Sequence, residues 1–281
     1  MGNTLIILGN GFDLDMGWRT SYADFYRSNY QSFNSINRMS YIANLISGQH
    51  WYDFEGYLRR CICDVTEDKL DELNLFWIFC RNRIGDYLSK DDIYTTNFNS
   101  CAYTFLQNIH DAKIVSFNYT NPYKRIHLPS KNINHIHGSL DNRLTGAELK
   151  FGVDTKVINE NILAQNDLLK HIIKSTDTSY FYDILLDLKG ATNIIFYGHS
   201  LGITDSDYFK SFFERVIDGK ITKKNIYIVT YDFCSLQSII QNLSFYEIDY
   251  SKLLLSDIRI TPIYTSQGVN DASFRQLIEI L

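Results

Sequence analysis

The stretch Thr4–Asp13, TLIILGNGFD, has the pattern of a strand followed by a glycine turn. Its first five residues are apolar or β-branched, as in a strand that is buried on both faces. The Gly9-Asn10-Gly11 sequence that follows ends this strand in a tight turn. Runs of the same kind predict five further strands, at 113–117 (KIVSF), 133–137 (INHIH), 193–197 (NIIFY), 225–230 (NIYIVT) and 259–264 (RITPIY).

Helical patterns separate most of these strands. Such alternation predicts an α/β fold, in which helices cover both faces of a largely parallel sheet. Strand signals are missing between residues 28 and 111, where apolar residues recur at helical spacing. We therefore predict one domain over residues 1–281, a three-layer Rossmann-like parallel sheet with a helical insertion at about 28–111.

Composition excludes several classes of partner. The chain has 27 Lys and Arg against 32 Asp and Glu, a net charge of -5, so no general affinity for nucleic acid is expected. No apolar run approaches about 18 residues and the N-terminus lacks a secretory pattern, which predicts a cytoplasmic protein that does not enter a membrane. Five cysteines form no CxxC pair, which indicates reduced thiols, and no signal for a particular oligomeric state is present.

Polar residues and glycines follow four of the predicted strands. Gly9, Asn10 and Gly11 follow the first strand, and Asn118, Tyr119 and Thr120 follow the second. The third strand exits through His137, Gly138 and Ser139. The fourth is followed by GHSLG at 198–202. Because the carboxyl ends of parallel strands open on the same side, we expect these groups to surround one crevice.

The glycines of the first turn have two interpretations. Without side chains, Gly9 and Gly11 would let backbone N-H groups approach a phosphate or ribose. Alternatively, Asn10 or Gly11 turns the chain at positive φ with no ligand present. Leu14 occupies the third glycine position of a GxGxxG motif and no GK[ST] follows, which disfavours both a dehydrogenase and a P-loop NTPase.

The GHSLG motif around Ser200 also fits the nucleophile turn of a serine hydrolase. In that class the histidine follows the serine, yet all seven histidines of this chain precede Ser200. Asp218 follows too closely and fits a turn with Gly219. His135 and His137 share one strand face and could bind a metal, but no third ligand is spaced suitably, so no metal is expected.

Several motifs together resemble a known family. They are LGNGFDLDMGWRTSYADF at 8–25, WYDFE at 51–55, SFNYT at 116–120, HIHGS at 135–139, FG at 151–152 and YGHSLGITDSDYF at 197–209. In this order, and across nearly the whole chain, they resemble the bacteriophage abortive infection AbiH family. The chain is more faintly similar to sirtuins and sirtuin-like NAD-cleaving defence proteins, although it lacks the four-cysteine zinc module of deacetylating sirtuins.

This resemblance implies a phage-defence protein that binds a nucleotide and hydrolyses NAD at the nicotinamide-ribose bond. It implies that His137 acts as a base toward a ribose hydroxyl and that Asn118 lies near the same ribose. The residues expected to bind the dinucleotide are Gly9, Asn10, Gly11, Phe12, Asp13, Tyr119, Gly198, His199, Ser200 and Asp205.

Other roles remain open. Asp205 and Asp13 could instead cap a helix and close a turn. Glu55, with Trp51 and Asp53, belongs to the resemblance but fits a packing and capping role at a helix start. The partners expected are a nucleotide and a phage-derived trigger. The alternative functions are a nucleotide-binding sensing module without turnover and, third, a serine hydrolase using Ser200.

Overall fold

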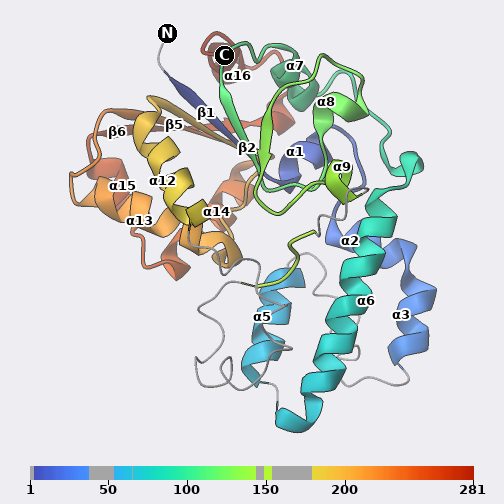
Figure 1. The fold of residues 1–281 in the computed structure, drawn as a ribbon. Coiled ribbons are helices and arrows are strands. Elements are labelled where there is room, and N and C mark those ends of the chain that lie inside the picture. Colours follow the sequence, from blue (N-terminus) through green and yellow to red (C-terminus); the bar gives the residue numbers. More distant parts are fainter. Residues whose placement is uncertain (1–2, 38–53, 65, 144–148, 154–178) are drawn as a thin grey trace.

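The computed structural model describes residues 3–37, 54–64, 66–143, 149–153 and 179–281. Its centre is a six-stranded, all-parallel sheet in the order β3-β2-β1-β4-β5-β6 (Figure 1). This is the Rossmann order, whose topological switch point lies between β1 and β4. The strands are β1 (Thr4–Leu8), β2 (Lys113–Ser116), β3 (Ile133–His135), β4 (Asn193–Tyr197), β5 (Lys224–Thr230) and β6 (Ile258–Tyr264).

All six strands lie where the sequence predicted them. The largest difference is in β3, which ends two residues early. The chain already turns there, since the Gly138 N-H donates to the carbonyl of His135 at 3.3 Å and Gly138 has φ 82°. His137 therefore lies on a loop beyond the sheet, where its side chain can turn toward a neighbouring strand exit.

Helices cover both faces of the sheet and form the outer two layers. Alternate residues of β1 point to opposite cores, Leu5 and Ile7 to one and Ile6 and Leu8 to the other. The first core is covered by α12 (Ser179–Gly190), α13 (Ser206–Ile217), α14 (Phe233–Phe245) and α15 (Tyr250–Leu255). The second is covered by α1 (Asn10–Asp15), α7 (Cys101–Gln107), α8 (Pro122–Arg125) and α16 (Ala272–Ile278). The predicted three-layer α/β class is confirmed.

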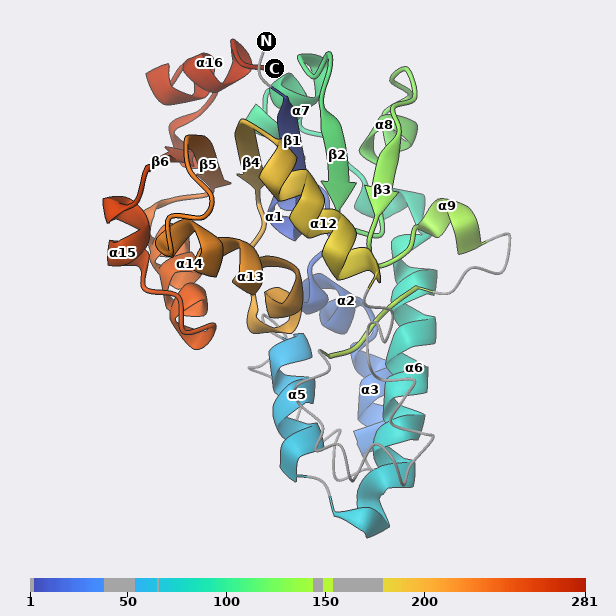
Figure 2. The same cartoon turned by 60° about the vertical axis from the view of Figure 1, so that its left-hand side comes forward.

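A helical lobe extends beyond the carboxyl ends of the strands (Figures 1 and 2). Its helices are α2 (Tyr22–Ser28), α3 (Tyr30–Asn37), α5 (Phe54–Asp64) and α6 (Leu70–Leu88), with short 3-10 turns η2 (Glu67–Lys69) and η3 (Asp91–Ile93). The lobe has a core of its own, in which the rings of Phe54 and Phe151 stack at 5.5 Å. The indole of Trp77 donates to the carbonyl of Phe151 at 2.9 Å.

The lobe differs from the predicted insertion at both ends. Its core already includes Phe25 in α2, extends along the chain to Ile93 in η3, and is completed by Phe151 and Val153 from much later in the sequence. Helix α7 follows the lobe in sequence but packs on the face of the sheet that α1, α8 and α16 also cover, where Phe105 is buried against Tyr197. The remaining elements are α9 (Leu140–Arg143), η5 (Ile203–Asp205) and η6 (Thr265–Gln267). No helix of the described segments is long and apolar enough to cross a bilayer.

Candidate functional site

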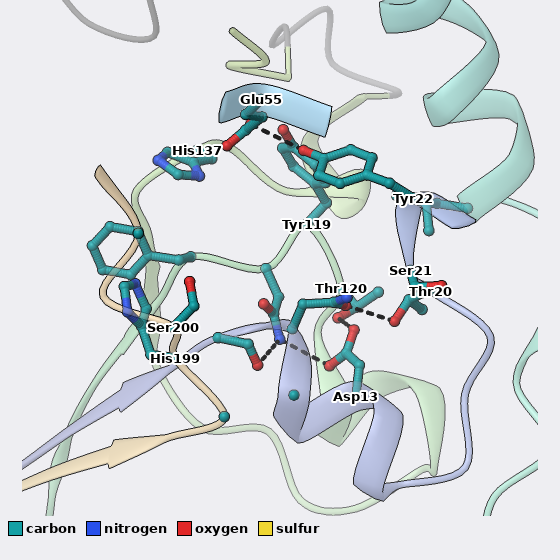
Figure 3. A pocket seen from close by; sticks show the side chains of 18 of the residues that line it. Asp13, Thr20, Ser21, Tyr22, Glu55, Tyr119, Thr120, His137, His199 and Ser200 are labelled. Atoms are coloured by element: carbon teal, nitrogen blue, oxygen red, sulfur yellow. Dashed lines mark hydrogen bonds between the residues drawn. The ribbon is translucent and has the colours of Figure 1, made fainter. Parts of the chain in front are cut away.

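A pocket of about 320 Å³ lies at the switch point of the sheet, between the carboxyl ends of the strands and the helical lobe (Figure 3). Loops after β1, β2, β3 and β4 form its floor and walls, and α2, α5 and α6 contribute residues from the lobe. Eleven of the twelve predicted site residues line this pocket, namely Gly9, Asn10, Gly11, Asp13, Asn118, Tyr119, His137, Gly198, His199, Ser200 and Asp205. The structure thus brings together residues that lie far apart in the sequence.

Phe12 is the predicted site residue that does not line the pocket. Its side chain is 0% exposed and packs edge-to-face on Tyr197, with the ring centroids 5.1 Å apart. Phe12 therefore anchors α1 in the second core, on the face of the sheet that α7, α8 and α16 also cover. The sequence pattern could not reveal this, because an aromatic residue after a glycine turn fits a core position and a pocket position equally well.

The glycines let two loops touch each other. The Gly9 N-H donates to the Tyr197 carbonyl at 3.0 Å, and the Gly11 N-H donates to the Gly198 carbonyl at 2.9 Å. A Cβ on Gly9 would lie 2.5 Å from the Cα of His199, which is closer than atoms can approach. These two amides are therefore occupied, which differs from the expectation that they approach a phosphate. Positive φ occurs at Gly198 (62°) rather than in the first turn.

A buried carboxyl group holds Asn118. The Asn118 amide nitrogen donates to Oδ1 of Asp13 and to the Gly9 carbonyl, both at 3.0 Å, and the Thr120 hydroxyl donates to Oδ2 of Asp13 at 2.6 Å (Figure 3). Asp13 is 1% exposed. Burial raises its pKa to about 7, although the hydrogen bonds from Thr120 and Asn118 act in the opposite direction. Asp13 lies within α1 and belongs to the pocket, rather than closing a turn.

A second carboxylate faces two imidazoles. Nε2 of His137 lies 3.5 Å from Oδ1 of Asp205, and Nε2 of His199 lies 3.7 Å from Oδ2. The Leu201 N-H donates to Nδ1 of His199 at 3.0 Å, so the proton of neutral His199 is on Nε2, toward Asp205. Asp205 occupies the N-cap position immediately before α13 (Ser206–Ile217), but its side chain makes no capping bond. Its carboxylate is directed at the pocket histidines instead.

Glu55 connects the lobe to the sheet across the pocket. The hydroxyl of Tyr22 donates to Oε1 of Glu55 at 2.9 Å, and the hydroxyl of Thr204 donates to Oε2 at 3.3 Å. Burial raises the pKa of Tyr22 well above its usual range, so Tyr22 stays a neutral donor. Figure 3 shows Glu55 on the same side of the pocket as His137.

Several lining residues were not predicted from the sequence. Tyr22 and Thr204 hold Glu55, and Phe117 packs edge-to-face on His137 and His199 with centroid distances of 5.2 Å and 4.5 Å. All three lie within motifs of the family resemblance, but an aromatic residue or a threonine in these motifs fits a packing role equally well, so the sequence did not single them out. Three residues of the WYDFE motif, 51–53, lie outside the described residues, and these include Trp51 and Asp53.

Ser200 does not have the geometry of a nucleophile. The strained backbone position of its loop is Leu201, with φ 47°, whereas a hydrolase nucleophile occupies the strained position itself. The side-chain amide of Asn242 donates to the Ser200 carbonyl at 2.8 Å. Within the described segments, no histidine hydrogen-bonds the Ser200 hydroxyl, and the adjacent His199 already contacts Leu201 and Asp205.

The two histidines of the HIHGS motif have different environments. Nδ1 of His135 lies 2.9 Å from the carbonyl of Asn118, and burial lowers the pKa of this imidazole. His137 faces Asp205. Among residues 3–37, 54–64, 66–143, 149–153 and 179–281, no group of three side chains is arranged to hold a metal ion.

Comparison with known proteins gives the family. The model of the family described as bacteriophage abortive infection AbiH matches residues 5–227. The chain belongs to the AbiH family. All lining residues of the pocket fall inside the matched range, and membership supports a role in phage defence.

A comparison with curated proteins found no match. Among solved structures, one described as "The Structural basis for Sirtuin Substrate affinity" is similar at 12% identity and a TM-score of 0.35. The match covers 99% of this chain and 92% of the other.

The crevice of this AbiH protein continues past the first pocket. A second pocket, of about 670 Å³, shares Gly11 and the 198–200 loop with the first. It extends below the ends of β5 and β6, where Tyr231, Ile239 and Thr265 line it. The 198–200 loop thus separates an end rich in carboxyl and imidazole groups from a more apolar end.

Proposed function

We propose that this AbiH protein hydrolyses NAD at the bond between nicotinamide and ribose as part of phage defence. The observation that carries the proposal is the meeting of His137, Asp205 and Asn118 in one pocket at the switch point of a Rossmann-ordered sheet. Dinucleotides bind at this position in such sheets. The family assignment supports the defence context.

The side chains suit cleavage of an N-ribosyl bond. Such cleavage passes through an oxocarbenium-like transition state, which requires a base near the ribose and negative charge near the reacting carbon. In the proposal, His137 takes a proton from a ribose hydroxyl, and Asp205, 3.5 Å away, stabilises the imidazolium that forms. Glu55 adds a second carboxylate on the same side of the pocket.

The proposed reaction is a balanced hydrolysis. The bond between the ribose carbon and the nicotinamide nitrogen breaks, and its electron pair neutralises the pyridinium ring. A water oxygen forms the new bond to the ribose carbon and releases one proton, and His137 returns to the ribose hydroxyl the proton that it took. The products are nicotinamide, ADP-ribose and the proton released by the water.

The shape of the crevice supports a ligand with two ends. The first pocket would take the nicotinamide riboside end, and the second would take the other nucleoside across the 198–200 loop. Tyr231 is exposed at the second pocket and presents an aromatic face, on which a base can stack. Ser200 lines both pockets and is assigned to hydrogen bonding with the ligand.

The alternative is a sensing module that binds the nucleotide without turnover. One observation favours it, since both oxygens of Glu55 and the amides of Gly9 and Gly11 already have partners within the protein. A ligand or trigger would have to displace some of these bonds before the groups could act.

Incubation of the purified protein with NAD separates these functions. One sample contains the protein and NAD alone, and a parallel sample also contains phage lysate as a possible activator. If the protein hydrolyses NAD, nicotinamide and ADP-ribose should accumulate in equal amounts. Calorimetric binding of NAD without either product, in both samples, would support the sensing module. Asn118→Ala is expected to weaken both NAD binding and turnover, because this residue would contact the ribose before and during the reaction.

A further inference from the structure

The orientation of the Asn118 amide is fixed by its surroundings. The two groups nearest its nitrogen, the Gly9 carbonyl and Oδ1 of Asp13, are both hydrogen-bond acceptors at 3.0 Å. Only an NH₂ group can bond both of them, and it uses its two protons to do so. What Asn118 can still offer the pocket is therefore its amide oxygen, which is an acceptor.

Asp13 is the side chain that, together with the backbone carbonyl of Gly9, holds this orientation. Thr120 holds the other carboxylate oxygen at 2.6 Å, so the plane of the Asp13 carboxyl group is fixed as well. We propose that Asp13 is a positioning residue, which keeps the nitrogen of Asn118 turned inward and its amide oxygen turned toward the ligand. The kinetic part of this inference rests on the proposed NAD hydrolysis, whereas the structural part does not.

An outward amide oxygen matches the chemistry of ribosyl transfer. Its partial negative charge can accept a bond from a ribose hydroxyl and stabilise positive charge that develops on the ribose in the transition state. A reversed amide would direct N-H groups at the same positive charge. The orientation of Asn118 is therefore expected to matter more for turnover than for binding.

The charge state of Asp13 gives an independent signal of this contact. Burial raises the Asp13 pKa to about 7, and the nearby Arg125 on α8 has an opposing effect. The charge of Asp13 also acts on Tyr94, and the Arg125 guanidinium lies 4.0 Å from the centre of the Tyr94 ring. When Asp13 takes up a proton, its bond with the Asn118 amide loses its charge-assisted character and weakens.

The structural test is an NMR titration of the Asn118 side-chain amide. Protein labelled with ¹⁵N-asparagine is measured between about pH 5 and pH 9, and Asn118→Ala identifies the signal by its loss. We expect the wild-type amide pair to shift with a midpoint near pH 7. In Asp13→Asn the pair should be constant with pH. A signal that does not move with pH, and has the same position in Asp13→Asn, would overturn the proposal.

The kinetic test is a double-mutant cycle on nicotinamide release. Asp13→Ala is expected to lower the rate by about 10 to 100-fold in the wild-type background, because a small misplacement of a reacting group costs that much. In the Asn118→Ala background it should lower the rate by less than about 2-fold. Asp13→Asn keeps an acceptor for Asn118 and should stay within about 10-fold of wild type. If Asp13→Ala lowers the rate by the same factor in the Asn118→Ala background as in wild type, Asp13 does not act through Asn118, and the positioning role is contradicted.

A stability control separates positioning from simple damage to the fold. Leu277→Ala removes a buried side chain in α16, on the side of the molecule away from the lobe (Figure 1), and is expected to lower stability without changing turnover. If wild-type protein releases no nicotinamide while its Asn118 amide titrates as described, the proposed hydrolysis fails and the positioning role stands.

Discussion

Asp13→Asn should make the protein more resistant to unfolding at alkaline pH. The structure buries the Asp13 carboxyl group at 1% exposure, and its pKa rises from an ordinary 3.8 to about 7. Between these values the folded protein retains a proton that the unfolded chain has released. The free energy of unfolding of wild type therefore falls as pH rises from about 4 to about 7, and then levels off.

The size of this effect follows from the pKa. At 1.36 kcal/mol per pKa unit, the rise from 3.8 to about 7 corresponds to a penalty of about 4 kcal/mol for the ionised group. Part of the penalty is already present at about pH 5, so between about pH 5 and pH 8.5 the change is about 2 to 3 kcal/mol. Asparagine can keep bonds to Thr120 and Asn118 but does not ionise. The free energy of unfolding of the variant therefore lacks this pH-dependent decrease.

Urea unfolding followed by circular dichroism at several pH values measures the difference. The free energy of unfolding of Asp13→Asn relative to wild type should rise by about 2 to 3 kcal/mol over that pH range. Asp249→Asn controls for the exchange of an acid for an amide, because Asp249 caps α15 and asparagine also caps helices. A difference that does not depend on pH, or one that favours wild type at high pH, would show that the Asp13 pKa is not raised in the folded protein.

Other predictions test the loops and the lobe. Gly198→Ala places a Cβ 2.1 Å from a backbone nitrogen of α1 and should destabilise the protein by more than about 3 kcal/mol, whereas Gly219→Ala, also at positive φ but in open space, should cost about 1 to 2 kcal/mol in thermal unfolding. Trp77→Phe leaves the Phe151 carbonyl without its indole donor and should cost about 1 to 3 kcal/mol in urea unfolding. A fluorophosphonate probe should leave Ser200 unlabelled by mass spectrometry, and Ser200→Ala should weaken NAD binding by only about 1 kcal/mol in calorimetry.

The sheet could be predicted from the sequence because its signals are local. Each strand is a short apolar run, and in parallel strands the polar residues that follow must meet at one edge. The boundary of the lobe could not be predicted in the same way. Helix α7 has the pattern of any amphipathic helix, and its packing under the sheet through Phe105 depends on tertiary contacts.

The pocket was predicted in part. Asn118 and His137 follow strands and could be recognised, whereas the bonds of Tyr22 and Thr204 to Glu55 join three segments that are distant in the sequence and have no local signal. The glycines were the most ambiguous signal. A glycine allows close approach of any atom, and at Gly9 that atom belongs to the neighbouring loop.

The most direct test of the proposed function is nicotinamide release by His137→Ala, measured together with NAD binding. Because the imidazole would act as base in the reaction, its loss should lower turnover by about two to four powers of ten and leave NAD binding largely intact. His110→Ala removes an exposed histidine that does not line the pocket and should behave as wild type. If His137→Ala releases nicotinamide as fast as His110→Ala, His137 is not the base, and the account of this pocket is contradicted.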